Sequence, residues 1–329
     1  MRKAFAVFVA VLLSTMPACL VRAEDYALSF RVDRARKTVV LESSALTAEV
    51  SGQHPSIKFH YTGDGRNLTH FRISLEKIIE YTADLEVAQE CDMGGWVGIY
   101  GDPYTIMGAD GSERGFNVQQ AFFKHPSFPF LIVFVETLMY RSTYNETRQL
   151  GTLTTTTTTL GGVEFRTRIT IIDWPFKNPD TGRLALVFRI EKEILGETSE
   201  QHRFRFEHGD GENELYIVGA DTRVDEGIVK WSNSALMSNA TDYYFISVET
   251  TSLEEAEHSA ELTLICDCAQ MGKTSVLEQT LTVGIVEENA EFIVHPTPPT
   301  ITPETIIVAA AVTLVVLTII VLKSRPKKS

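Results

Sequence analysis

The sequence predicts an all-β fold: an antiparallel β-sandwich-type ectodomain followed by one C-terminal transmembrane helix. Three observations lead to this prediction: alternation of apolar and polar residues along short segments, turn residues between those segments, and one uncharged run near the C-terminus. Alternation with a period of two is typical of a strand with one buried and one solvent-facing side. Ten or more such strands at this spacing favour a β-sandwich.

The N-terminus has the pattern of a secretory signal peptide. Arg2 and Lys3 precede an apolar stretch from Ala4 to Leu13, and Val21-Arg22-Ala23 fits a small-residue cleavage site. We therefore expect residues 1–23 to be removed, with a retained first membrane helix as the alternative. An acidic, β-rich extracellular domain over residues 24–294 follows.

The clearest strands lie in the middle of the chain. From Val163 to Ile171 the odd positions are apolar or threonine and the even positions are polar, which predicts one dry and one wet face, and Arg183–Glu193 repeats the alternation. Leu75–Leu85 and Ser252–Ala260 instead favour short helices. One sandwich, or two split near residues 150–160, would accommodate these strands. Further strands are predicted at Ala27–Val32, Thr38–Leu41, Ile57–Tyr61, Phe71–Leu75, Phe130–Val135, Glu214–Val218, Tyr243–Val248, Glu261–Cys266 and Thr280–Val286.

Two segments of this region have an unusual composition. Six consecutive threonines, Thr154–Thr159, favour a strand because threonine is β-branched, with an O-glycosylated segment as the alternative. Trp174-Pro175-Phe176 stands between the two alternating strands. We interpret it as a hairpin whose aromatic side chains cap the end of the core, rather than as an exposed aromatic platform.

The C-terminal segments predict a membrane anchor. Residues 295–305 are rich in proline and threonine, which is typical of an extended stalk. Residues 306–322 carry no charge and would span roughly 26 Å as a helix, at the short end of what a bilayer core requires. The basic tail, 323–329, predicts a cytoplasmic C-terminus. We expect a type I single-pass protein of the plasma membrane, with a glycolipid anchor as the alternative.

The expected ectodomain is strongly acidic. Three of the 30 lysines and arginines leave with the signal peptide and four lie in the tail, so 23 remain against all 43 acidic residues, a net charge of −20. Nucleic acid and anionic lipid are therefore poor partners, because both require basic patches. Cations, basic proteins and mineral surfaces are better matched.

Covalent modification of the ectodomain is predicted at two kinds of residue. Three cysteines remain after signal removal, and we expect Cys91 to form a disulfide with either Cys266 or Cys268. Three N-x-[ST] sequons predict N-glycosylation of Asn67, Asn145 and Asn239.

The sequence contains no recognisable catalytic set. It lacks the G-x-S-x-G and H-E-x-x-H patterns, and its histidines are scattered, with only His54 and His60 near metal-ligand spacing. No cofactor is expected apart from weakly bound calcium, for which Asp210, Glu212 and Glu214 supply carboxylates in a glycine-containing loop. Ordinary polar turns are the alternative for these residues.

The layout of the whole chain resembles some uncharacterised skeletal organic matrix proteins of stony corals. The residues behind this resemblance are Trp174-Pro175-Phe176 between alternating strands, the acidic loops, and the span from Ile306. The resemblance implies a component of a calcified matrix, with matrix proteins or calcium carbonate as partners. The chain differs from the most acidic members because it has no block of consecutive aspartate or glutamate residues.

These observations lead to three functional hypotheses. The first is a non-enzymatic cell-surface or extracellular-matrix glycoprotein, anchored or shed into the matrix and occluded in mineral. The second is an adhesion or receptor module that binds a protein or a glycan, and the third is a membrane-tethered hydrolase.

Overall fold

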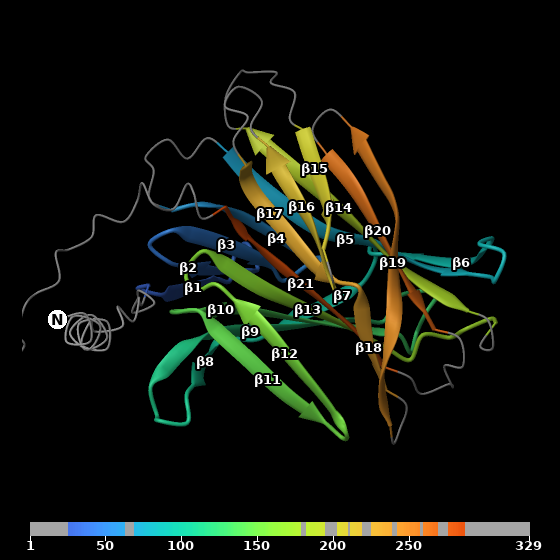
Figure 1. Ribbon diagram of the computed structural model, residues 1–329, viewed down its shortest axis with the longest axis horizontal. Helices are drawn as coiled ribbons and strands as arrows, with labels where there is room; N and C mark the ends of the chain where they lie inside the picture. Colours follow the sequence, from blue (N-terminus) through green and yellow to red (C-terminus); the bar gives the residue numbers. More distant parts are fainter. Residues whose placement is uncertain are drawn as a thin grey trace, which may run out of the picture. The chain divides into compact units, whose positions relative to one another are not determined.

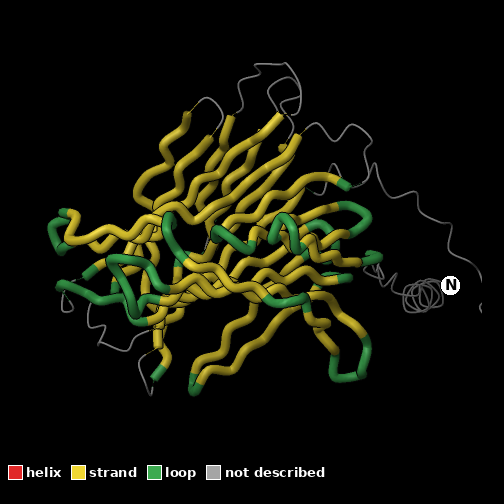
Figure 2. Tube along the Cα trace, turned by 180° about the vertical axis from the view of Figure 1, so that it is seen from behind, coloured by secondary structure: helices red, strands yellow, loops and turns green. Residues whose placement is uncertain are grey.

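The computed structural model describes residues 26–62, 69–178, 182–194, 203–209, 211–218, 225–238, 242–256, 259–268 and 276–286. This part of the chain consists of strands and loops and contains no helix (Figure 1, Figure 2). The expected all-β, antiparallel class is confirmed. Within these residues no helix is long and apolar enough to cross a bilayer. The predicted signal peptide, stalk, span and tail lie outside them.

Most strands belong to two antiparallel sheets, here called sheet A and sheet B. Sheet A contains β1 (Ser29–Asp33), β2 (Thr38–Glu42), β3 (Leu46–Ser51), β4 (Ser56–Tyr61), β5 (Thr69–Tyr81), β6 (Val87–Asp92), β14 (Arg183–Ile194) and β20 (Ser259–Asp267). Sheet B contains β7 (Val97–Tyr100), β8 (Tyr104–Met107), β9 (Glu113–Phe123), β10 (Ile132–Tyr140), β13 (Glu164–Ile172), β15 (Arg203–His208), β16 (Glu212–Val218), β17 (Asp225–Ser232), β18 (Ser234–Ser238) and β21 (Val276–Ile285). A separate two-stranded ribbon is formed by β11 (Tyr144–Leu150) and β12 (Leu153–Thr159).

The two sheets share one core. Apolar side chains from both sheets form a single buried cluster, in which Phe59 of β4 and Phe165 of β13 meet edge to face at 5.6 Å between ring centroids. Strand β19 (Tyr243–Ala256) joins the sheets, since it pairs first with β18 and then with β20. Both sheets take strands from before and after residues 150–160. The fold therefore does not divide there, and that region is the ribbon.

Neither expected helix forms. In the first segment, Leu75–Leu85, a β-bulge explains why the sequence has a helix-like period. Leu75 and Ile78 are both buried in the core although they are three residues apart, which imitates helical spacing. The pairing of β5 with β14 shifts register between Val187 and Phe188, so Glu76 is an extra residue in β5. A bulge breaks the period of two in this way. The second segment, Ser252–Ala260, lies in β19 and β20, next to another register shift.

The segment around Trp174 crosses from one sheet to the other and is not a hairpin. It follows β13 of sheet B and leads to β14 of sheet A, and these strands do not pair with each other. Trp174 is buried and stacks on Phe128 at 5.2 Å, and Phe176 packs against the core. The expectation that these aromatic side chains cap the core is confirmed, whereas the hairpin is wrong.

A buried carboxylate fixes this crossing. Glu80 of β5 is fully buried and accepts hydrogen bonds from Trp174 Nε1 (3.1 Å), from the backbone N–H groups of Lys177 and Asn178, and from Gln89 Nε2 (2.6 Å). A buried charge is tolerated only when donors surround it. Glu80 therefore ties sheet A to the segment that leaves sheet B.

The expected bridges of Cys91 are not formed. The three cysteines among the described residues are buried free thiols, and burial raises the pKa of Cys91 and of Cys266 to about 12. Cys91 lies on β6 and Cys266 on β20, and strands β5 and β14 stand between them. Three strand spacings amount to roughly 14 Å, twice the Cα separation that a disulfide can span. Cys268 lies two residues after Cys266, just beyond the end of β20, and is separated from Cys91 by the same two strands.

Replacing Glu80 by glutamine should destabilise the fold by about 3 kcal/mol, because the amide cannot accept from all the buried donors that the carboxylate satisfies. Urea unfolding of the full-length chain in detergent, followed by tryptophan fluorescence, measures this loss. The matched control is Glu90→Gln, which removes a pair with Lys77 (3.1 Å) at a side chain that is 42% exposed. The control should cost less than about 1 kcal/mol. Equal losses in both variants would contradict the role of Glu80.

Candidate functional site

The β11–β12 ribbon covers part of the outer face of sheet B. The threonine run is strand β12, as expected, and it pairs with β11 from Tyr144↔Thr159 to Leu150↔Leu153. Alternation divides it into two faces. Thr155, Thr157 and Thr159 are at least half-buried, whereas Thr154, Thr156 and Thr158 are exposed. The run is therefore one wall of a ribbon that lies over β13.

Charged residues hold the ribbon on the sheet. Arg168 of β13 contacts Glu136 of β10 at 2.7 Å, Glu146 of β11 at 2.8 Å and Glu278 of β21 at 3.4 Å. Arg166, with a side chain only 1% exposed, also pairs with Glu146 and donates to the backbone oxygen of Thr157 at 2.8 Å. The predicted wet face of β13 is therefore buried under the ribbon, and this correction defines the site.

Two members of this network, Glu136 and Arg168, favour their charged forms. Burial opposes ionisation of Glu136, but hydrogen bonding from Gln119 and the charge of Arg168 outweigh it, so the pKa of this carboxyl is lowered. Burial likewise opposes the charge of Arg168, but Glu278, Glu146 and Glu136 together raise the pKa of its guanidinium. Glu136 and Arg168 are therefore each stabilised in the charged form by partners from other strands, whereas burial lowers the pKa of Arg166.

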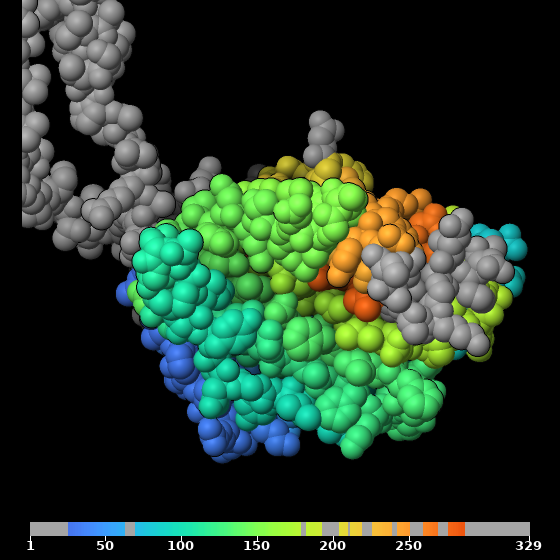
Figure 3. All heavy atoms as spheres, turned by 90° about the horizontal axis from the view of Figure 1, so that it is seen from below, coloured from blue at the N-terminus to red at the C-terminus, as the bar shows by residue number. Residues whose placement is uncertain are grey.

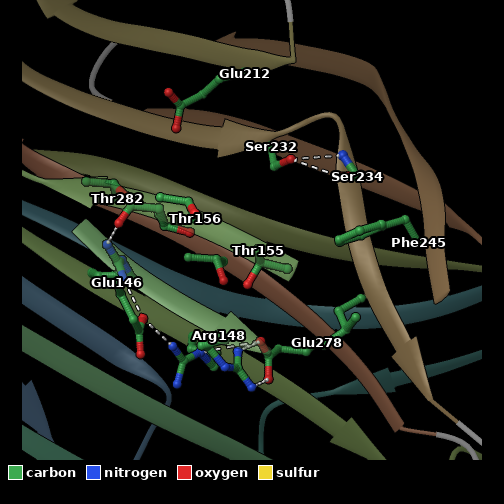
Figure 4. A pocket seen from close by; sticks show the side chains of 15 residues that line it. Glu146, Arg148, Thr155, Thr156, Glu212, Ser232, Ser234, Phe245, Glu278 and Thr282 are labelled. Atoms are coloured by element: carbon green, nitrogen blue, oxygen red, sulfur yellow. Dashed lines mark hydrogen bonds and ion pairs between the residues drawn. The ribbon is translucent and has the colours of Figure 1, made fainter. Parts of the chain in front are cut away.

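A pocket of about 280 Å³ lies between the ribbon and the strands beyond it (Figure 4). Glu146, Arg148 and Glu278 form one side, and Ser232, Ser234 and Glu212 lie opposite. Leu236 and Phe245 add apolar surface, and the Phe245 ring is 47% exposed. The remaining lining residues are Thr155, Thr156, Thr157, Arg166, Arg168, Thr280 and Thr282.

Several polar groups of the pocket remain available. The hydroxyls of Thr155, Thr157, Thr280 and Thr282 make no side-chain hydrogen bond within the described part of the chain. The Nε of Arg166 is buried and has no hydrogen-bond partner there. A buried polar group without a partner is costly, so a ligand that bonded to it would gain free energy.

Glu212 stands at the pocket's opposite wall. Its side chain is exposed, yet the protein around the carboxyl raises its pKa, because partial burial outweighs the attraction of Lys230. Within the described residues no ion pair engages Glu212 itself, whereas Glu146 and Glu278 both hold arginines. Glu212 is thus the pocket carboxyl best placed to meet a ligand.

Two of the three predicted calcium ligands lie within the described residues. Glu212 and Glu214 lie two residues apart on β16, and Asp210 lies outside the described residues. Glu214 accepts from the Tyr216 hydroxyl at 2.6 Å and lies 4.0 Å from Lys230, which itself pairs with Glu164 at 3.0 Å. Across the described ranges, no three His, Cys, Asp or Glu side chains gather as a metal would require. Calcium binding at these residues stays a prediction.

Of the predicted glycosylation sites, one can be placed. Asn145 is exposed on the outer side of the ribbon, and its Oδ1 accepts from the Thr158 hydroxyl at 2.7 Å. A glycan there would project away from the pocket, because Glu146, the next residue, faces inward. Asn67 and Asn239 lie outside the described residues.

The structure pairs a different set of histidines from the one that spacing suggested. His60 of β4 lies beside His70 of β5 with ring centroids 4.4 Å apart, whereas His54 lies before β4. The pKa of His60 is lowered first by burial and then by His70 and Lys58, against the opposing effect of Glu49. Burial also lowers the pKa of His54.

Pattern reasoning missed the residues that build the pocket. Arg166, Arg168 and Glu278 are alternate residues of β-strands, and such positions normally face water. The sequence held one signal of their burial. Two arginines lie close together on one strand, next to a threonine-rich segment that is able to cover them. The chain matches no protein-family model and no curated protein, so the site is interpreted from its own geometry.

Replacing Arg168 by methionine should cost about 3–5 kcal/mol of unfolding free energy, because three carboxylates lose their common buried partner. Arg114→Met is the matched control, since its pair with Asp110 (2.8 Å) is exposed and should contribute far less to stability. Urea unfolding of the full-length chain compares the two. A loss no larger than that of the control would show that the ribbon does not depend on Arg168.

Stability should fall as the pH drops below about 6.5, the ordinary pKa of histidine. The folded chain resists protonation of His60 and His54, whereas the unfolded chain takes up these protons. The stabilisation is therefore present above that pH and is lost as the pH falls through the lowered pKa. Urea midpoints at pH 7.5, 6.5 and 5.5 measure the slope, and His60→Asn should flatten it. An unchanged slope in that variant would contradict the assignment.

Proposed function

We propose that this protein is a non-enzymatic, single-pass type I cell-surface glycoprotein whose extracellular β-sandwich binds a glycan in the ribbon pocket. The observation that carries this proposal is a polar pocket in which unpaired hydroxyls stand beside an exposed aromatic ring. Binding sites combine a few well-placed polar groups with apolar surface in this way. The volume of about 280 Å³ is suited to a ligand the size of one sugar residue.

Chemistry favours a saccharide over other small ligands. A sugar carries many hydroxyls, each a donor and an acceptor, which match the threonine and serine hydroxyls and the Arg166 Nε–H. The C–H face of a pyranose ring can lie against Phe245, as apolar groups do on aromatic rings. The pocket's three arginines are balanced by glutamates, so a strongly anionic ligand gains no net attraction.

Binding is favoured over hydrolysis by the state of the pocket carboxylates. A glycosidase requires an acid and a second carboxylate that is free to act on the sugar or on water. Glu146 and Glu278 are held by arginines, which leaves Glu212 as the one pocket carboxyl without an ion pair in the described part of the chain. A membrane-tethered hydrolase is the rival, and turnover of any glycoside by the full-length chain would establish it.

A role in a calcified matrix is a second candidate. It is supported by the expected ectodomain charge of −20 and by the resemblance to coral skeletal proteins. Calcium carbonate adsorption by the full-length chain, compared with that of a neutral β-sandwich protein, separates it from glycan binding. Equal adsorption would remove the mineral role and leave the pocket unaffected.

Filling the pocket should abolish glycan binding. Thr155→Tyr places a ring in the pocket, whereas Thr154→Tyr places the same ring on the exposed face of the same strand and is the matched control. On a glycan array probed with the full-length chain, we expect Thr155→Tyr to lose at least tenfold in affinity for every glycan that the unmodified chain binds. The control should keep its affinity. Equal binding by both variants would place the glycan site elsewhere.

A further inference from the structure

Two histidines meet on the outer face of sheet A. Phe59 of β4 pairs with Phe71 of β5, and both of these side chains are buried in the core. Side chains alternate between the two faces of a strand, so the next opposed pair, His60 and His70, lies on the other face. The centroids of the two imidazole rings are 4.4 Å apart. Figure 3 shows the N-terminal strands, in blue, at the lower left, apart from the bright green ribbon.

One ring nitrogen of this pair is buried without a hydrogen bond. The Nδ1 atom of His60 has no hydrogen-bond partner among the described residues. The pKa of His60 is lowered, first by burial and then by His70, so its ring is neutral at pH 7. A neutral imidazole is the form that binds a metal ion. A buried polar atom without a partner costs free energy, and a ligand that bonds to it recovers this cost.

The separation of the two rings matches a shared metal ion. A bond from a metal to an imidazole nitrogen is about 2.0–2.1 Å long, which puts the ion about 3.2 Å from the ring centroid. Two rings bound at a right angle around one ion would therefore have centroids about 4.5 Å apart. The observed separation of 4.4 Å is close to this value. One ion can thus bind both rings after they turn about their side-chain bonds.

The surroundings leave the pair open to solvent and nearly neutral. Both histidines are half-buried, so an ion in water can reach them. Among the described residues no third His, Cys, Asp or Glu side chain completes a group with them. The closed cage of a structural zinc ion is therefore absent, and water would hold the remaining positions of an open site. Glu49 attracts a cation to His60 and Lys58 repels it, and these two residues are paired across β3 and β4.

We propose that His60 and His70 form an open site for one divalent transition-metal ion, and that Cu²⁺ binds there most tightly. Imidazole ligands suit Cu²⁺, Ni²⁺ and Zn²⁺, and Cu²⁺ has the highest affinity of the three for a given set of ligands. Ca²⁺ and Mg²⁺ are disfavoured, because they prefer oxygen ligands. The bound ion links β4 to β5. The site is separate from the ribbon pocket, whose lining contains neither histidine, and it goes beyond the proposed glycan binding.

The test is a Cu²⁺ titration of the full-length chain, without an affinity tag, in detergent at pH 7.5. Calorimetry measures the affinity, and we expect His60→Asn and His70→Asn each to weaken it at least tenfold. His54→Asn is the matched control, because His54 is also half-buried with a pKa lowered by burial but lies outside the pair. This control should keep its affinity within twofold.

Two further measurements keep the result interpretable if a variant is less stable. An ion that binds the folded chain stabilises it, so Cu²⁺ should raise the urea midpoint of the unmodified chain and of His54→Asn. It should not raise the midpoint of His60→Asn or His70→Asn, each compared with the same variant without metal. Electron spin-echo spectroscopy of the bound Cu²⁺ should detect two imidazoles in the unmodified chain and one at most in each variant of the pair.

Three outcomes would overturn the inference. Undiminished Cu²⁺ affinity in His60→Asn and His70→Asn, or an equal loss in His54→Asn, would place the ion elsewhere on the chain. No measurable binding of Cu²⁺, Ni²⁺ or Zn²⁺ by the unmodified chain would show that the two rings meet through packing alone. Glycan binding by His60→Asn should be unchanged in each case, so failure of the metal site leaves the pocket proposal intact.

Discussion

The site depends on two guanidinium groups buried beneath a β-ribbon. Arg168 is 9% exposed and is surrounded by carboxylates from β10, β11 and β21, three elements that do not otherwise meet at one point. Burying a charge costs several kcal/mol unless its partners are in place. The ribbon can therefore leave the sheet only by exposing this network to water or stranding its charges. Its position, and with it the pocket wall, is fixed by electrostatics more than by apolar packing.

The same network divides the outer face of sheet B into two surfaces. On one side the ribbon covers charged rows of β13 and creates a polar pocket, and on the other the rows remain uncovered and apolar. Glu278 lies at the boundary, where it holds Arg148 of the ribbon. A polar pocket and an uncovered, more apolar surface thus lie side by side on sheet B.

Local sequence patterns predicted the strands, but not how they are covered. The strands predicted at Val163–Ile171 and Arg183–Glu193 are observed as β13 and β14, because a two-residue period in the sequence is a local property. The burial of Arg166 depends on a tertiary contact with the ribbon. The sequence around an arginine looks the same whether its side chain is exposed to solvent or covered by another element. The helix predicted at Leu75–Leu85 was wrong for the opposite reason. There the irregular pairing at Glu76 altered the local sequence period itself. The Cys91 bridge failed because strand order, which places β5 and β14 between the cysteines, is not encoded in their spacing.

The threonine run links these arguments. An isolated two-stranded ribbon is marginal in water, and an apolar one would bury its inner face directly on the sheet and close the pocket. Threonine keeps the β-branched shape that favours a strand while leaving a hydroxyl on each inward side chain. Thr155 and Thr157 therefore hold the ribbon extended without filling the space beneath it. The composition that makes this segment unusual as sequence is what allows a ribbon to remain ordered above an open, hydroxyl-lined pocket.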